Sequence, residues 1–236
     1  MPERFALYYA PAITHPLWLR AARWLGRDPA GTAGAPAEVP GIDTAYRLKI
    51  SDSARRYGFH ATLKAPMGLA PGVTRAELEA ELVRFASGAP QAQIGRLKIA
   101  NLDGFVALIP AVQGDELTHL AASIVTEFEP FRAPMSAAGR EKRLSGGYLS
   151  PRQIEYIARY GYPYVMEEFR FHMTLTDRLS DAERPAVLAA AEDWFGPLLE
   201  TSFLLDRIAL FHETDPGAPF TRLADFPLSV RVKADA

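Results

Sequence analysis

Two histidines in this chain of 236 residues stand in the same short string. Phe-His-x-Thr-Leu occurs around His60 and again around His172, and each histidine is followed two positions later by a threonine, Thr62 or Thr174. In-line cleavage of a phosphoester needs a base at the entering oxygen, an acid at the leaving oxygen, and donors for the charged oxygens between them. Imidazole titrates near neutral pH, so one histidine can be the base and the other the acid. The twin strings therefore predict acid–base chemistry on a phosphate ester, with the threonines bound to the phosphate.

A third histidine, His212, fits the shorter pattern Phe-His-x-Thr. When the two halves of the chain are aligned, it falls opposite residues 100–103, outside the repeated string. We interpret it as a turn or rim histidine, because a motif match needs its structural context. His15 and His119 lie on expected helices without partners, and we interpret both as solvated or packed.

The elements around the two strings recur in the same order: strand, helix, motif strand, helix, strand. Leu97 and Ile99 in the first unit correspond to Ile208 and Leu210 in the second. Duplicated units of this kind pack about a pseudo-two-fold axis, which would bring the motif strands to face each other across a cleft.

Periodicity, turn residues and capping patterns locate these elements. Thr74 with a Glu three residues on, and Ser150 with a Gln three residues on, each form a capping-box pattern. Residues 133–147 are small, basic and glycine-containing, and are the best candidate for a mobile linker or lid. We expect strands at 4–10, 57–65, 93–99, 105–109, 168–176, 203–211 and 220–228, helices at 15–25, 74–88, 115–128, 150–161 and 181–195, and a loop at 28–41.

Further substrate-binding candidates follow from strand alternation. Side chains two apart on a strand share a face, so Lys64 is expected on the cleft face with Thr62, and Arg170 on that of the second motif. Both would bring positive charge to a phosphate. Arg143, in the expected linker, is a third cationic candidate. Tyr164 is a candidate for stacking on a base or sugar.

Two more tyrosines, Tyr8 and Tyr148, could stack in the same way. The competing interpretation is that aromatic residues in strands and near helix ends belong to the core. For the surface cations, the competing interpretation is a solvated strand end.

The paired His-x-Thr strands in a duplicated chain resemble the two-histidine phosphoesterase superfamily, which includes RNA 2′,5′-ligase-like and cyclic-nucleotide phosphodiesterase proteins. The strings Arg-Tyr-Gly-Phe-His-Ala-Thr-Leu-Lys-Ala-Pro at 56–66, Gly-Tyr-Pro-Tyr at 161–164 and Phe-Arg-Phe-His-Met-Thr-Leu at 169–175 resemble more narrowly a branch associated with phosphonate metabolism and the carbon–phosphorus lyase operon.

The superfamily resemblance implies a bilobal α+β fold, with pseudo-two-fold lobes whose antiparallel-rich sheets line a central cleft. It also implies catalysis by His60 and His172 without a metal, and Thr62 and Thr174 on the phosphate. The branch resemblance implies a cyclic phosphate or a phosphoribosyl compound as substrate. We expect one bilobal domain, 1–236, with repeat halves of roughly 1–100 and 101–236. Which histidine is the base, and whether the reaction runs as hydrolysis or ligation, stay open.

Composition limits the alternatives. The net charge is −2, so no basic field for non-specific nucleic-acid binding exists. The chain has no cysteine, which excludes disulfides and thiolate zinc sites. The N-terminal residues show no signal pattern, and we expect a soluble, cytoplasmic protein. No cofactor is expected, and the expected partner is a small phosphorylated substrate, with a nucleotide or short RNA end as a further option.

Two rival functions remain. His60 and His172 could be zinc ligands, but neither has a His, Asp or Glu at ligand spacing beside it. The cleft could also be a non-catalytic module for RNA or nucleotides. The absence of a basic stripe interleaved with aromatic residues counts against that interpretation.

Overall fold

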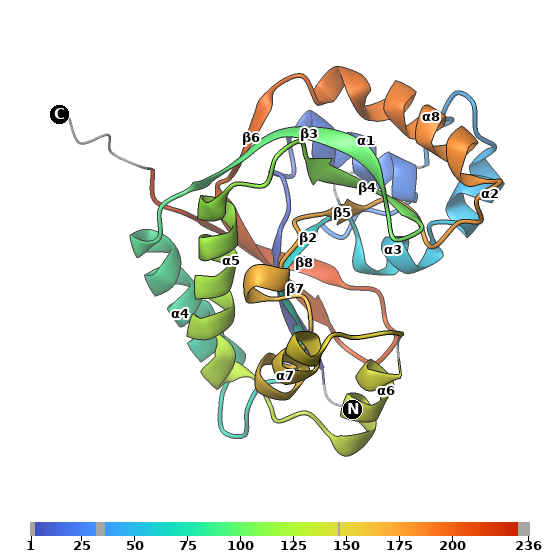
Figure 1. Ribbon diagram of the computed structural model, residues 1–236. Coiled ribbons are helices and arrows are strands. Elements are labelled where there is room, and N and C mark those ends of the chain that lie inside the picture. Colours follow the sequence, from blue (N-terminus) through green and yellow to red (C-terminus); the bar gives the residue numbers. More distant parts are fainter. Residues whose placement is uncertain (1–2, 32–35, 146, 231–236) are drawn as a thin grey trace.

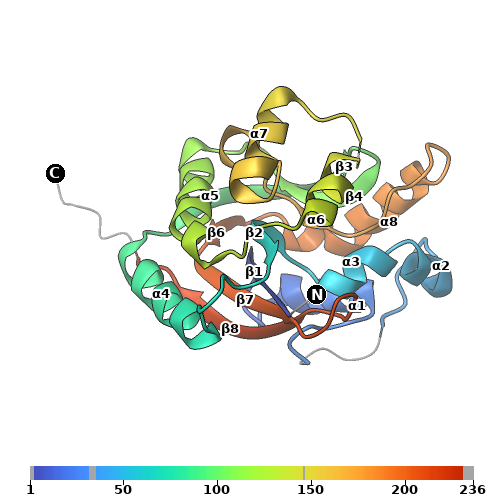
Figure 2. The ribbon, with the colours of Figure 1, turned by 90° about the horizontal axis from the view of Figure 1, so that it is seen from below.

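The two lobes of the protein are built on two four-stranded sheets (Figures 1 and 2). The computed structural model describes residues 3–31, 36–145 and 147–230. Every strand pair is antiparallel, so the predicted α+β, bilobal architecture is confirmed. The first sheet, in the order β2-β1-β7-β8, contains β1 (Arg4–Tyr9), β2 (Ala61–Met67), β7 (Arg207–Glu213) and β8 (Thr221–Pro227). The second sheet, in the order β5-β4-β3-β6, contains β3 (Ala92–Leu102), β4 (Phe105–Pro110), β5 (Met173–Thr174) and β6 (Ser202–Leu205).

Helices cover both sheets. Helix α4 packs on β7 and β8, α8 packs on β3 and β4, and α5 contacts β2 and β3 and so bridges the lobes. In the described part of the chain, no helix combines the length and the apolar character needed to cross a membrane. The α-helices are α1 (Pro16–Leu25), α2 (Thr44–Lys49), α3 (Asp52–Tyr57), α4 (Arg75–Gly88), α5 (Asp115–Glu127), α6 (Ala137–Leu144), α7 (Pro151–Tyr160) and α8 (Arg184–Phe195), and the 3-10 helices are η1 (Glu129–Phe131), η2 (Met166–Glu168) and η3 (Gly196–Leu198).

The two repeat units exchange their last strands. In the repeat order, β1, β2 and β3 belong to the first unit, and β4, β5 and β7 to the second. The first sheet nevertheless pairs β1 with β7, and the second pairs β4 with β3. Both sheets therefore have the same arrangement, with the motif strand at one edge, the first strand of its unit beside it, and the third strand of the other unit next.

The larger of two hydrophobic clusters in the described residues runs through both lobes. It contains Phe5 from the first sheet, Leu108 from the second, and Trp24 and Phe195 from the helices between them. The rings of Trp24 and Phe195 meet with centroids 5.6 Å apart. Because residues of both sheets belong to this cluster, the two lobes pack against each other through a shared core.

Local sequence signals located most of the elements. Thr74 caps α4 and Ser150 caps α7, each through the capping box that the spacing predicts. Gly161 ends α7 at a φ of 73°, as a helix C-cap glycine does. The β3–β4 hairpin turns at Asp103 and Gly104, both with positive φ.

Several expectations about the elements were wrong or incomplete. The single strand expected at 203–211 is two strands in different sheets, β6 and β7, separated at Asp206, whose carbonyl accepts from the Leu228 amide at 2.8 Å. The six-residue helices α2 and α3 were not predicted, since neither is long enough to show helical periodicity. The segment expected as a linker contains α6, which Ser136 caps by accepting from Gly139 N.

Residue 146 of that segment, and residues 32–35 of the expected loop, lie outside the described residues. The mobility of the segment stays a prediction.

Candidate functional site

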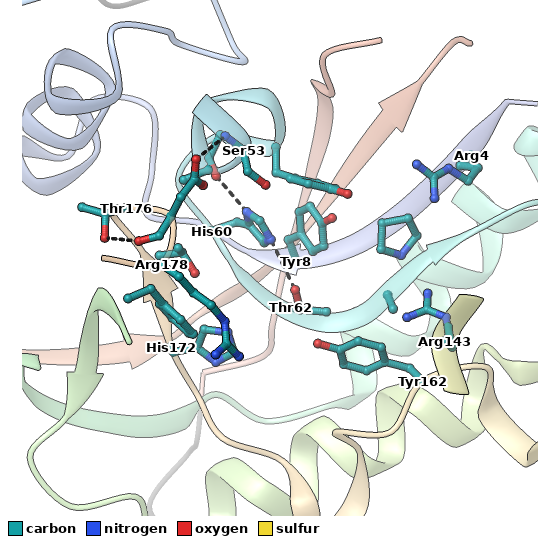
Figure 3. Close-up of a pocket in the computed structure, with 18 residues that line it drawn as sticks. Arg4, Tyr8, Ser53, His60, Thr62, Arg143, Tyr162, His172, Thr176 and Arg178 are labelled. Atoms are coloured by element: carbon teal, nitrogen blue, oxygen red, sulfur yellow. Dashed lines mark hydrogen bonds between the residues drawn. The ribbon is translucent and has the colours of Figure 1, made fainter. Parts of the chain in front are cut away.

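Both motifs line one cavity of about 520 Å³ between the lobes (Figure 3). His60 and Thr62 reach it from the first sheet, and His172 and Thr174 from the second. The motif strands β2 and β5 are the edge strands of their sheets and contact each other. Each histidine lies one residue before its strand begins. The structure thus brings together the four residues on which the predicted chemistry depends.

The ring of His60 is held on three sides. Its Nδ1 lies 2.8 Å from the carbonyl oxygen of Gly58, and its Nε2 lies 3.3 Å from the hydroxyl oxygen of Thr62. A carbonyl oxygen only accepts, so Nδ1 carries the proton and Nε2 is the free base, accepting from the threonine hydroxyl. The Tyr8 ring stacks on the imidazole with centroids 3.7 Å apart. This places a basic nitrogen at the cavity.

His172 has the same backbone contact. Its Nδ1 lies 2.7 Å from the carbonyl oxygen of Arg170, so its Nε2 is also the free nitrogen. The chain around that carbonyl is fixed by the side-chain amide of Gln113, which donates to the Phe169 carbonyl at 2.9 Å and accepts from the Phe171 amide at 2.8 Å. Gln113 is therefore a positioning residue for His172, and no sequence pattern pointed to it.

The second motif strand is much shorter than expected, because the regular ladder stops after Thr174. The Leu175 and Thr176 amides both donate to the Val106 carbonyl, at 2.9 and 3.3 Å. The Thr176 hydroxyl, rather than a backbone carbonyl, accepts from the Val106 amide at 3.0 Å. The Leu175 carbonyl accepts from Trp24 Nε1 at 3.1 Å and from the Ser51 hydroxyl at 2.9 Å. These contacts hold the segment after Thr174 as firmly as a strand would, but in an irregular conformation.

Both histidine pKa values are lowered in the free protein. Burial lowers the pKa of His60 from 6.5 to about 4, with a smaller contribution from His172, although the bond to Gly58 opposes the shift. Burial also lowers the pKa of His172, where the Arg170 guanidinium adds to the effect and the bond to the Arg170 carbonyl opposes it. Both rings are therefore neutral at pH 7 before substrate binds.

Lys64 does not lie on the cleft face where alternation placed it. Tyr8 pairs with Thr62, and Leu7, the residue before Tyr8 in β1, pairs with Lys64. Leu63 therefore has no partner on β1, and β2 has a bulge at this point. Leu63 and Lys64 are consequently both buried. The ammonium of Lys64 donates to the Val125 carbonyl at 3.0 Å and pairs with Glu129 at 2.9 Å, which makes it a structural residue.

Of the other candidates, Arg143 lines the cavity, whereas Arg170 and Tyr164 do not. The Arg170 side chain is 64% exposed and lies 3.8 Å from Asp103. Tyr164 is 44% exposed and packs edge-on against Tyr162, which does reach the cavity. The two residues come from a segment without regular structure, where alternation along a strand gives no guide to direction.

The remaining tyrosine and histidine candidates have other positions. Tyr8 lies beneath His60 and is 1% exposed, whereas Tyr148 is 97% exposed and away from the cavity. His212 pairs with Glu3 at 2.6 Å and stacks on Phe5, also outside the cavity. His15 caps α1, where its Nδ1 accepts from the Leu17 amide.

Several cavity residues were not among the sequence candidates. Arg4, Tyr57, Tyr162 and Arg178 all line it. Tyr57 and Tyr162 lie within the strings that carry the branch resemblance, and that was the one available signal for them. Arg4 and Arg178 stand in no motif.

A metal site was the rival interpretation of the histidines. Within the described ranges, no group of three or more His, Cys, Asp or Glu side chains is placed to hold a metal ion. Metal independence itself remains a prediction, which activity in the presence of a chelator tests.

Comparisons with known proteins give a family and several relatives. The family model described as "Protein of unknown function (DUF1045)" matches residues 62–221. Two curated proteins named ribose 1,5-bisphosphate phosphokinase PhnN are similar: that of Janthinobacterium sp. (strain Marseille) is 34% identical over 96% of this chain, and that of Laribacter hongkongensis (strain HLHK9) is 35% identical over 92%. The matches cover 51% and 50% of those proteins, so the chain spans about half the length of these relatives.

Two solved structures are also similar. E. coli LigT complexed with 3′-AMP is 13% identical, with 97% of this chain and 99% of that chain covered and a TM-score of 0.46. A structure described as a phosphoesterase is 14% identical, with 97% and 99% covered and a TM-score of 0.42.

Proposed function

We propose that this chain, which belongs to the DUF1045 family of proteins of unknown function, is a metal-independent two-histidine phosphoesterase acting on a small cyclic phosphate or phosphodiester. The observation that carries the proposal is the matched pair of histidines at one cavity. Each has its Nδ1 tied to a carbonyl two residues earlier, and each is followed by a threonine at the same cavity. With Nδ1 held in this way, each histidine exchanges a proton through its Nε2, and a pair of such groups at one cavity can supply the base and the acid of in-line transfer.

In the proposed reaction, one histidine takes a proton from the attacking water as its oxygen bonds to phosphorus. The bond from phosphorus to the leaving oxygen breaks, and the other histidine, which is protonated at Nε2 in the reacting form, gives that proton to the leaving oxygen. A cyclic phosphate opens in this way to a phosphomonoester beside a free hydroxyl. When substrate binds, the Thr62 hydroxyl turns from His60 Nε2 to the phosphate. Thr62 and Thr174 then donate hydrogen bonds to the non-bridging oxygens, whose charge grows in the transition state.

The substrate class is proposed from two observations, the size of the cavity and the names of the relatives. A cavity of about 520 Å³ is in the range that holds one small ligand. The relatives are named for a phosphorylated ribose, and we propose a phosphoribosyl or nucleotide cyclic phosphate here, within the phosphonate metabolism that the sequence resemblance implies. Gly-Lys-Ser and Gly-Lys-Thr, the ends of a P-loop, occur nowhere in the chain, so the proposed activity is esterase rather than kinase.

The direct test is a substrate panel of 2′,3′-cyclic nucleotides, ribose cyclic phosphates and 2′,5′-linked oligonucleotides, each with and without EDTA. We expect at least one cyclic phosphate to be opened to a monoester at a rate that EDTA does not change. Loss of activity in EDTA that a divalent metal restores would contradict metal independence. Joining or cleavage of the 2′,5′-linked oligonucleotides alone would indicate RNA end processing. Binding without turnover, unaffected by His172→Ala, would indicate a non-catalytic module.

The dependence of kcat/KM on pH follows from the two lowered pKa values. The base must be neutral, so kcat/KM falls as pH drops through its pKa, and the acid must be protonated, so kcat/KM falls as pH rises through its pKa. In the free protein the pKa of His60 is about 4 and that of His172 is below 6.5. We therefore expect a bell-shaped profile with its maximum below pH 6.5, whichever histidine is the base. A maximum on the alkaline side of 6.5, measured on the best panel substrate, contradicts this assignment.

A further inference from the structure

One end of the cavity gathers tyrosine hydroxyls and arginines. We call it the phenol–guanidinium end and define it by Arg4, Tyr8, Tyr57, Arg143 and Tyr162, all of which line the cavity. They come from β1, the end of α3, α6 and the loop after α7. Figure 3 shows Arg4, Arg143 and Tyr162 on the side of His60 and Thr62 that lies away from Thr176 and Arg178.

The three phenol hydroxyls of this end have no protein partner. Among the described residues, none of Tyr8, Tyr57 and Tyr162 forms a side-chain hydrogen bond, and none of their oxygens is sealed off from the cavity. Tyr8 is nevertheless 1% exposed as a residue. A buried tyrosine ordinarily finds a partner for its hydroxyl. Three tyrosines without a hydroxyl partner on the lining of one cavity therefore point to ligand oxygens.

The arginines of this end leave a positive charge uncompensated. In the described part of the chain, Arg143 pairs with no carboxylate, and its guanidinium lies over the Tyr162 ring, 5.3 Å from the centroid. Arg4 shares one carboxylate, the buried Glu213, with Arg56. Glu213 is thus shared by two guanidinium groups, so the charge of Arg4 is only partly compensated and that of Arg143 is not compensated by a described carboxylate.

This charge is also separate from the reacting centre. Figure 3 shows Arg4 and Arg143 on the side of Thr62 that lies away from His172. A phosphate held between the histidines is served by the two threonines. The arginines are therefore placed for a second anionic group on the same ligand.

We propose that the phenol–guanidinium end binds a second phosphoryl group of the substrate, apart from the phosphate between the histidines. This inference rests on the proposed function and narrows it: the substrate is a cyclic phosphate or diester that also carries a terminal phosphomonoester. The unpaired Arg143 and the partly compensated Arg4 favour an anionic group here, and the phenols and guanidiniums supply the donors for its oxygens. Arg143, the arginine without a carboxylate, is the residue on which the preference depends most.

The test uses adenosine 2′,3′-cyclic phosphate with and without a 5′-phosphate. Binding of both is measured by calorimetry on the full chain carrying His60→Ala and His172→Ala, where no turnover occurs. Since a hydrogen bond to a charged group contributes substantially more than a neutral one, we expect the 5′-phosphate to strengthen binding by about 10- to 100-fold. Adding Arg143→Met should reduce that advantage to less than about 5-fold. The matched control is Arg140→Met on the same helix, which does not line this cavity and should leave the advantage intact.

Inorganic phosphate serves as a third probe that requires no cyclic ester. Its binding should weaken with Arg143→Met and not with Arg140→Met. If neither cyclic compound binds or is cleaved but phosphate binding still depends on Arg143, the proposed function fails and the second site stands. If the intact protein opens both compounds equally well, or if the 5′-phosphate advantage survives Arg143→Met, the second site is refuted while the phosphoesterase assignment stands.

Discussion

His60→Ala and His172→Ala each lower kcat/KM on the cleaved phosphoester by about 10³-fold, as expected for the loss of one proton-transfer group. The effect is large because each ring supplies the one free Nε2 on its side of the cavity, and the threonine beside it cannot take up a proton. The double variant should lose little more than either single variant, since the two groups act on one transition state. Steady-state kinetics on the best substrate of the panel measures all three.

His212→Ala is the matched control for these variants. It removes a histidine from the same Phe-His-x-Thr pattern, but that side chain pairs with Glu3 outside the cavity. We expect wild-type kinetics. A substrate that both His60→Ala and His172→Ala still cleave at the wild-type rate would disprove the catalytic assignment.

Gly58→Ala combines a loss of stability with a loss of activity. Gly58 has a φ of 82° and a ψ of 176°, a conformation that residues with a side chain rarely adopt. A Cβ atom built there would lie 2.0 Å from Cγ of Pro29, so the ring or the loop must move. The carbonyl that must move with it is the one that holds His60 Nδ1. We expect the free energy of unfolding to fall by about 3 kcal/mol and kcat/KM by about 10²-fold.

Gly72→Ala is the control that separates the effect of backbone strain from that of the steric clash between residue 58 and Pro29. Gly72 has the same φ of 82°, yet a Cβ atom there would have no atom within 4 Å. It should cost only about 1 kcal/mol, the usual penalty for a left-handed alanine, and leave the kinetics unchanged. Urea unfolding and steady-state kinetics of the two variants give the comparison, and equal effects would show that Pro29 does not constrain the motif.

Features encoded by neighbouring residues were predictable from the sequence. The capping boxes of Thr74 and Ser150, the hairpin at Asp103 and the twin motifs each depend on residues a few positions apart, and all were found at the expected places. The repeat added the one long-range expectation, that the motifs line a common cleft. It was sufficient to identify His212 as an outlier without the structure.

What the sequence did not reveal depends on contacts between distant residues. The bulge that buries Lys64 arises in the pairing of β2 with β1, and no property of β2 alone specifies it. The two hydrogen bonds from the Gln113 side chain to the segment before His172 join two loops that are far apart in the chain. Tyr162 and Tyr164 have nearly the same neighbours in the sequence. Only the structure shows that Tyr162 lines the cavity and that Tyr164 does not.

The exchange of third strands between the repeat units also has a consequence for synthesis of the protein. β1 leaves the ribosome before the other strands described here, but β7, its partner in the sheet, follows almost 200 residues later. At roughly 5–20 residues per second, β1 waits for its partner for roughly 10–40 seconds. During that time its apolar edge is open to other chains, a recognised cause of aggregation. A nascent chain that stalls between the two motifs is therefore one that chaperones must protect, because neither half can complete a sheet alone.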